Sequence, residues 1–350
     1  MNTEENNFGV TEQSPSAQEA AFVAGSEFTE AGRKKRSGWR IFWIVFTVLS
    51  VLANIFLFLA LIGFGAMFVA GQRGIFTEEV LIEGPRTAKI AVVGIEGVID
   101  DRCFEDFSRR LKSAQKDERV KGVIVKINSP GGMVSASDRI YNQIVQYQQQ
   151  TQKPAVALME GMAASGGYYT SVACREIIAE PTTITGSIGV IMGHFVLEKL
   201  FEEKLGIKPV IIKAGEKKDW PSSFEEPTEE QKEYIQERLI RPAYERFVEV
   251  VAEGRESLTI DDVRRLADGS IYGADRALEE KMIDGIGYLD SAVERVLSLA
   301  GIEKAQVIEY RRPFSFWSVF GLSGQSLLSI DKASLYELSM PELLYLWRAY

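Results

Sequence analysis

The sequence contains almost no histidine and very little cysteine. Its 350 residues include one histidine, His194, and two cysteines, Cys103 and Cys174. Two isolated cysteines cannot build a disulfide framework or a typical Cys/His metal site, and they leave open only a single bridge. The shortage of histidine also removes the group that most often activates a catalytic serine.

The sequence also lacks an excess of positive charge. Its formal net charge is −9, from 40 Lys and Arg against 49 Asp and Glu. Binding to a phosphate backbone relies on clustered Lys and Arg, and the only basic cluster lies within residues 33–40. We therefore expect no nucleic-acid partner.

One long segment contains no charge at all. It runs from Ile41 to Gln72, 32 residues rich in Phe, Leu, Val and Ile. At ~1.5 Å per residue a helix of this length exceeds the ~30 Å hydrocarbon core, so one tilted span fits and two do not. A cleaved signal peptide would lie within the first ~30 residues and be shorter. We therefore expect a permanent transmembrane anchor over residues 38–72.

The charges beside this segment predict its orientation. They are Arg33, Lys34, Lys35, Arg36 and Arg40 before it, and Arg73, Glu78, Glu79 and Glu83 after it. The positive-inside rule places the N-terminus in the cytoplasm. Residues 1–32 carry six Glu and no Lys or Arg, a composition too polar to pack. We expect a disordered cytoplasmic tail over 1–37, an inner-membrane location, a linker over 73–87 and an extracytoplasmic domain over 88–312.

The outer domain alternates short apolar runs with amphipathic stretches, the pattern of βα units around a largely parallel sheet. The expected strands are 89–99, 120–127, 154–159, 176–179, 187–192 and 209–213, and the expected helices are 104–116, 135–149, 166–173, 195–205, 228–253, 260–267, 274–282 and 291–299. Thr228 followed by Gln231 resembles a capping box. Residues 313–350 form an apolar C-terminal tail, which we expect to pack on the domain, on a partner subunit or at the membrane surface.

Ser165 is the candidate nucleophile. It lies between a predicted strand and a predicted helix, within Ala163-Ala164-Ser165-Gly166-Gly167. Acyl transfer requires a nucleophile, two N–H donors for the oxyanion, and a base. The N–H of Gly166 and that of Gly132, which follows an earlier strand, can supply the two donors because glycine permits close approach. The alternative is that these glycines only form a helix start and a turn.

The base is less easily assigned. His194 follows Ser165 by 29 residues, and three lysines, Lys213, Lys217 and Lys218, lie further along the chain. An exposed lysine has a pKa near ~10.4, so a lysine accepts a proton at neutral pH only where burial lowers that value. A lysine base is favoured over His194, although a solvated loop is the alternative. Spacing alone does not separate Lys217 from Lys218.

Five stretches of this sequence resemble the signal peptide peptidase A (SppA) family. These proteins are membrane-anchored Ser/Lys peptidases with a Clp-type or crotonase-like α/β fold. The matching stretches are 128–132, 161–169, 182–190, 213–219 and 268–287. The resemblance spans residues 89–299 and is to the short, single-domain form of the family.

The resemblance assigns roles to particular residues. It implies that Ser165 is the nucleophile, Lys218 the general base, Gly132 and Gly166 the oxyanion donors, and Ser187 a hydroxyl that orients the base lysine. It also implies a homo-oligomer in which serine and lysine meet across neighbouring protomers. The implied substrates are remnant signal peptides and other membrane-associated peptides, cleaved without a metal or other cofactor.

Two other functions are compatible with the same fold. A crotonase-type acyl-CoA enzyme shares the oxyanion arrangement, but acyl-CoA is cytosolic and the domain is expected to face outward. A noncatalytic membrane scaffold is the other alternative, and the presence of both Ser165 and Lys218 argues against it. The tail over 313–350 carries a further hypothesis, that it is processed by the enzyme itself.

Overall fold

The computed structural model describes residues 38–72, 76–311 and 342–347. The chain forms two units, Met1–Val69 and Ala70–Tyr350. Helix α1, Gly38–Gln72, begins in the first unit, and its segment Gly38–Gly65 has a mean hydropathy of 2.6 with no buried residues. This segment is long and apolar enough to cross a membrane. The cytoplasmic tail expected over 1–37 lies outside the described residues.

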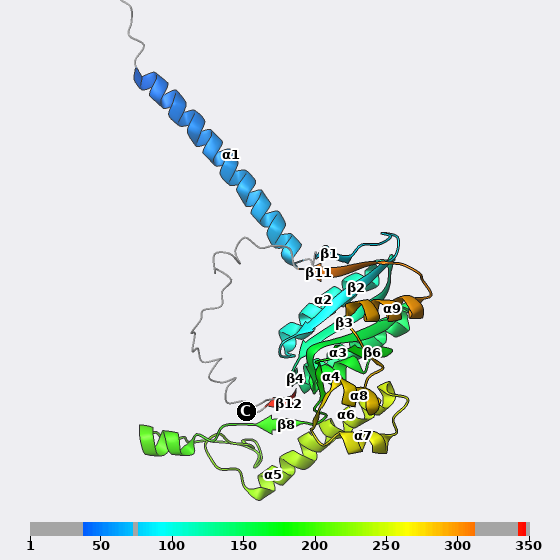
Figure 1. Cartoon of the computed structure of the whole chain (residues 1–350). Coiled ribbons are helices and arrows are strands. Elements are labelled where there is room, and N and C mark those ends of the chain that lie inside the picture. Colours follow the sequence, from blue (N-terminus) through cyan, green and yellow to red (C-terminus); the bar gives the residue numbers. More distant parts are fainter. Residues whose placement is uncertain (1–37, 73–75, 312–341, 348–350) are drawn as a thin grey trace, which may run out of the picture. The chain divides into compact units, whose positions relative to one another are not determined.

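The second unit is built on a mixed, mostly parallel sheet (Figure 1). Its main strands follow the order β1-β11-β2-β3-β5-β6-β10, with β7 beside β5 and β9 beside β7. The bounds are β1 Thr77–Ile82, β2 Lys89–Glu96, β3 Val120–Ser129, β5 Ala155–Ala164, β6 Glu176–Ala179, β7 Ile184–Gly186, β9 Ile271–Gly273, β10 Gly285–Ile286 and β11 Gln306–Arg311. All neighbours from β11 to β10 run parallel. The predicted α/β class is confirmed.

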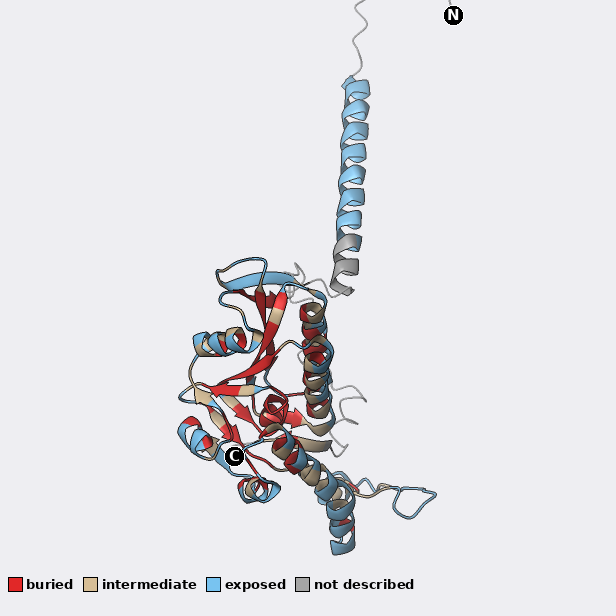
Figure 2. Cartoon of the chain, turned by 90° about the vertical axis from the view of Figure 1, so that its right-hand side faces the viewer, coloured by how far each residue is buried: buried red, intermediate tan, exposed pale blue. Residues whose placement is uncertain are grey.

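The sheet is covered on both faces because alternate residues of its strands point to opposite sides. On one face Val93 packs in a core with Phe107 and Ile140, from α2, Asp101–Lys116, and α3, Val134–Thr151. On the other face Val92 packs with Val296 of α9, Leu289–Ala300. Figure 2 shows the buried residues concentrated in the strands and along the helix sides that face them.

A long helical segment lies where the sequence predicts one helix, over 228–253. It consists of α5, Glu229–Ile235, the π-helical η2, Gln236–Ile240, and α6, Arg241–Gly254. The capping box at its start is confirmed: the Gln231 N–H donates to Thr228 Oγ1, and the Thr228 N–H donates to Gln231 Oε1. The short helices α4, Gly166–Ser171, α7, Ile260–Leu266, and α8, Ala274–Glu279, also lie where helices were expected.

Two predicted strands differ from the structure. Of the strand expected over 187–192, only residues 191–192 are in a strand, β8, Ile191–Gly193, because Ser187 has φ 52° and turns the chain out of the ladder after Gly186. The run 209–213 has apolar residues but no ladder partner within the described residues, and Ile212 is 96% exposed. The helix expected over 195–205 starts only at residue 198 and contains a π-helical turn, Leu200–Lys204. Cys103 and Cys174 are free thiols.

Both ends of the domain contribute strands that were not predicted. Strand β1 lies in the expected linker, 73–87, and pairs antiparallel with β11, so the sheet begins before residue 88. A second sheet has three strands, β4 Gly131–Met133, β12 Glu342–Leu346 and β8 Ile191–Gly193, with β12 in the middle. Strand β12 belongs to the expected apolar tail, so this part of the tail packs on the domain (Figure 1).

Candidate active site

Ser165 occupies a sharp turn between β5 and α4. Its backbone has φ 53° and ψ −114°, an uncommon conformation for a residue with a side chain. The Ser165 N–H donates to the Gly186 carbonyl at 2.7 Å, and its own carbonyl accepts from the Tyr169 N–H at 2.8 Å. Such conformations cost free energy and cluster at functional sites. The turn holds Ser165 at the end of a buried strand, with 1% of its surface exposed.

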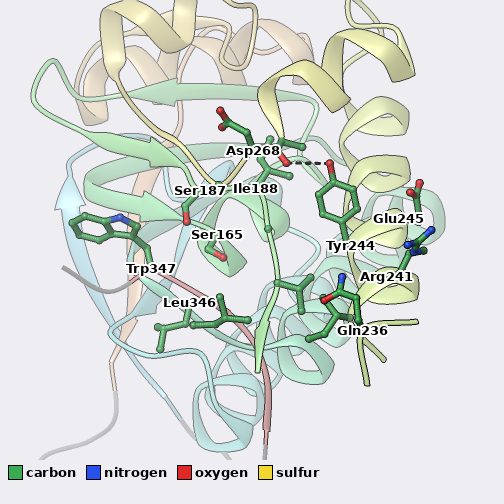
Figure 3. A pocket seen from close by; sticks show the side chains of 16 residues that line it. Ser165, Ser187, Ile188, Gln236, Arg241, Tyr244, Glu245, Asp268, Leu346 and Trp347 are labelled. Carbon is green, nitrogen blue, oxygen red and sulfur yellow. Dashed lines mark hydrogen bonds between the residues drawn. The ribbon is translucent and has the colours of Figure 1, made fainter. Parts of the chain in front are cut away.

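Ser187 lies beside Ser165 because the two strands that precede them are paired. Strands β5 and β7 run parallel, with Ala164 opposite Gly186. The serine that follows each strand leaves the ladder with a positive φ, 53° for Ser165 and 52° for Ser187. Both serines line one cavity of about 740 Å³, hereafter the Ser165 cavity (Figure 3). The structure therefore brings together two of the residues that the sequence singled out.

The two candidate oxyanion glycines, Gly132 and Gly166, both lie near Tyr345 of β12, one as its strand partner and the other beside its carbonyl. Gly132 is in β4 and pairs with Tyr345 of β12, and Gly166 is the first residue of α4. A Cβ on Gly166 would lie 3.2 Å from the Tyr345 carbonyl oxygen, and one on Gly131 would lie only 2.0 Å from it. Gly131 also has φ +97°. This close approach of two backbones requires glycine.

The side chain of Tyr345 fills an aromatic pocket formed by Tyr169, Ala243 and Phe247. Its ring lies 5.0 Å from the ring of Tyr169 and 4.7 Å from that of Phe247, and it is fully buried. The Tyr345 hydroxyl donates to the Ala243 carbonyl at 2.7 Å. Burial raises the pKa of Tyr345, so the hydroxyl stays a donor at neutral pH. The pocket thus receives the side chain of the residue whose carbonyl oxygen lies close to Gly131 and Gly166.

Sequence reasoning missed the aromatic pocket. Tyr169 follows Ser165 by one turn of helix, a spacing that could have suggested it as a wall of the site. Ala243 and Phe247 are four residues apart on α6 and share one face of that helix. Nothing local in the sequence connects α6 with Ser165, because the helix reaches the site through tertiary packing.

No lysine or histidine is among the described residues that line the Ser165 cavity. The lining residues are Ser165, Ser187, Ile188, Gly189, Val190, Ile191, Gln236, Ile240, Arg241, Tyr244, Glu245, Ala267, Asp268, Gly269, Leu346 and Trp347. His194 lies beyond β8 and is half-buried elsewhere. Lys218 is exposed in the loop before α5. One chain therefore brings Ser165, Ser187 and the glycines together but leaves the proposed base outside.

The fold and the site define a serine hydrolase whose cleft holds an extended peptide segment. Residues 147–303 match the model of peptidase family S49, and residues 85–181 match that of Clp protease. The chain belongs to peptidase family S49, and it is a hydrolase of the serine peptidase class.

Relatives from two bacteria and a plant show this similarity. A protein of Enterococcus faecium named after signal peptide peptidase SppA is 37% identical over 246 residues, which cover 67% of this chain and 70% of the relative. Serine protease SPPA, chloroplastic, of Arabidopsis thaliana is 31% identical over 68% of this chain and 36% of its own. Protease 4 of Haemophilus influenzae is 36% identical over 60% of this chain and 35% of its own. This chain thus spans well under half of the last two proteins.

Proposed function

We propose that this chain is a membrane-anchored serine endopeptidase that cleaves remnant signal peptides or other membrane-associated peptides. The observation that carries the proposal is the position of β12. An extended segment lies antiparallel between β4 and β8, with Tyr345 paired with Gly132 and the Tyr345 carbonyl oxygen close to Gly131 and Gly166. Addition of a strand to an exposed edge is a general way of binding peptides with main-chain hydrogen bonds. A substrate peptide would occupy the place of β12.

The proposed chemistry is acyl transfer through Ser165. Its Oγ attacks the carbonyl carbon that faces the glycines, while its proton passes to the neutral amine of Lys218. The N–H groups of Gly132 and Gly166 stabilise the oxyanion. When the C–N bond breaks, Lys218 returns the proton to the departing amine. A water molecule then hydrolyses the ester on Ser165, and Ser187 orients the lysine through its hydroxyl.

The base in this proposal comes from a neighbouring protomer of a homo-oligomer. Two observations support this arrangement. Lys218 does not line the Ser165 cavity of its own chain, and residues 191–212 form an arm that exposes nine large apolar side chains. Val210 is 80% exposed and Ile212 is 96% exposed in that arm. Contiguous exposed apolar surface marks interaction sites, and burial between protomers removes the charge of a lysine.

The proposed location is the inner membrane, with the N-terminus in the cytoplasm and the peptidase domain outside. The apolar helix α1 supports the anchor. The basic residues before it and the acidic residues after it support the orientation. This location would place the peptidase next to the membrane surface, where cleaved signal peptides are left.

The test is digestion of a defined signal peptide by the detergent-solubilised full-length chain. Ser165→Ala and Lys218→Ala should each lower the cleavage rate by about 10³-fold or more, because each removes one member of the dyad. Exposed residues of the same types provide matched controls, Ser257→Ala and Lys232→Ala, which should cleave like the wild type. Thermal melts check that all four variants are folded. Wild-type cleavage by either dyad variant would refute the assignment.

A further inference from the structure

The loop that carries the proposed base, residues 213–220, is closed by contacts at its two ends. Lys213 Nζ donates to Asp219 Oδ1 at 2.6 Å, and this hydrogen bond lowers the pKa of Asp219, which stays a charged partner. Within the loop the Lys218 N–H donates to the Gly215 carbonyl, and the Trp220 N–H donates to the Lys217 carbonyl. The backbone around Lys218 is therefore a defined turn.

Lys217, next to the proposed base, is held by two aromatic rings. Its Nζ lies 4.7 Å from the ring centroid of Trp220 and 4.5 Å from that of Tyr234, and the two rings meet edge to face. The same Nζ is 3.7 Å from Glu230 Oε1. Ring faces and a carboxylate all stabilise an ammonium ion, whereas a general base has to give up its charge. The Lys217 ammonium group is thus already engaged by two rings and a carboxylate.

Lys218 differs from its neighbours in the loop. Lys213 and Lys217 each have a partner for their ammonium group. The Lys218 side chain is exposed, and within the parts of the chain that the structure describes it has neither a hydrogen bond nor an ion pair. The amine of Lys218 is therefore the one in this loop that can reach another surface without first breaking a contact.

The aromatic contact also joins the loop to the helix that lines the Ser165 cavity. Tyr234 is on α5, and α5 continues through η2 into α6. Gln236 of η2 and Tyr244 of α6 both line that cavity. One continuous helical segment carries Tyr234, Gln236 and Tyr244. The contact of Lys217 with Tyr234 therefore attaches the loop to the same helical segment that lines the Ser165 cavity.

We propose that Lys217 is a positioning residue for Lys218. Its ammonium group is clamped between Trp220 and Tyr234, and this clamp fixes the loop so that the Lys218 amine projects from it. The inference rests on the proposed function, in which Lys218 is the base. It adds a role for Lys217, which acts through its charge and never receives the proton of Ser165.

The test compares Lys217→Met and Lys217→Arg in the full-length chain with a defined signal peptide as the substrate. Methionine keeps the length but not the charge, so kcat should fall by about fivefold or more while KM changes little. Arginine keeps the cation over the rings but cannot serve as a base, so Lys217→Arg should retain most of the activity. Lys232→Met, on an exposed lysine paired with Glu229, is the matched control and should match the wild type.

A double-mutant cycle with Tyr234→Leu tests whether the loss of kcat in Lys217→Met comes from the lost contact between Lys217 and the Tyr234 ring. If Lys217 acts through the ring, the double variant Lys217→Met/Tyr234→Leu should have about the same kcat as Lys217→Met alone. A wild-type kcat for Lys217→Met, or a Lys217→Arg variant as slow as Lys217→Met, overturns the inference. Lys218→Met separates this from the proposed function, because an active Lys218→Met refutes the base itself, whatever Lys217 does.

Discussion

Ser165 and Ser187 obtain their positions from the backbone rather than from side-chain contacts. Each follows the last residue of a paired strand, and each has a φ near +50°. The Ser165 N–H is fixed by the Gly186 carbonyl and the Ser187 N–H by the Ser270 carbonyl, both at 2.7 Å. Two hydroxyl groups are thereby held next to each other at one end of the sheet. A lysine amine that enters the cavity between protomers would meet both of them.

At the residue scale, Gly131 should tolerate no side chain. Alanine there would have to adopt φ +97°, and its Cβ would fall 2.0 Å from the Tyr345 carbonyl oxygen. Gly131→Ala should therefore lose at least about 1 kcal/mol of unfolding free energy and most of its peptidase activity. Denaturant unfolding and peptide cleavage measure the two effects.

The control for Gly131 is Gly301→Ala at the end of α9. Gly301 also has a positive φ, +65°, but a Cβ there would meet no atom within 4 Å. This variant should lose a similar amount of stability, about 1 kcal/mol, and keep its activity. Equal activity in the two variants would show that crowding at Gly131 has no role in substrate binding.

At the scale of the element, β12 should be a substrate of the site in which it lies. The Tyr345 carbonyl oxygen lies close to Gly131 and Gly166, and Leu346 and Trp347 line the Ser165 cavity. The bond between Tyr345 and Leu346 is therefore placed like a scissile bond. We expect active enzyme to end at Tyr345 and the Ser165→Ala variant to keep Tyr350.

Intact-mass measurement of both proteins, purified in the same way, checks this prediction. Addition of active enzyme to the Ser165→Ala variant provides the control, because it shows whether the variant's C-terminus can be cut in trans. Identical C-termini in the wild type and the variant would contradict self-processing.

Elements set by local pattern were predicted well, and those set by distant pairing were not. The β-branched run over 120–127 and the capping box at Thr228 carry their own evidence in the sequence. Strand β1 reads Thr-Glu-Glu-Val-Leu-Ile and is largely exposed, so only its partner β11, at the other end of the domain, makes it a strand. Strand β12 likewise depends on β4 and β8. The run 209–213 is apolar in composition but has no partner strand among the described residues, so the strand predicted there is wrong.

The site shows the same division. Ser165 and Gly166 could be proposed from the sequence because a nucleophile and its adjacent N–H are neighbours in the chain. The pairing of Ser187 with Ser165 depends on the register of β5 and β7, which the sequence does not display. The aromatic pocket depends on α6. The contacts of Lys217 with Trp220 and Tyr234, on which we base our proposal for Lys218, are a property of the folded loop.

At the scale of the whole molecule, one chain has the proposed nucleophile and the proposed oxyanion donors but presents its proposed base elsewhere. The exposed apolar arm over 191–212 is the surface that a second copy would cover. A contact of this kind joins two different patches, so copies arranged head to tail can close into a ring. In such a ring every protomer would donate one lysine and receive another.

This arrangement predicts that two inactive variants repair each other. Ser165→Ala retains Lys218, and Lys218→Ala retains Ser165. In a 1:1 mixture with random exchange, about a quarter of the interfaces would combine an intact serine with an intact lysine. Activity should therefore rise from background toward about a quarter of the wild-type rate, whereas the double variant mixed with either single variant should stay inactive. Exchange is verified by light scattering and by differently tagged chains. If exchange is complete and activity does not recover, serine and lysine belong to the same chain and the loop must close over its own cavity.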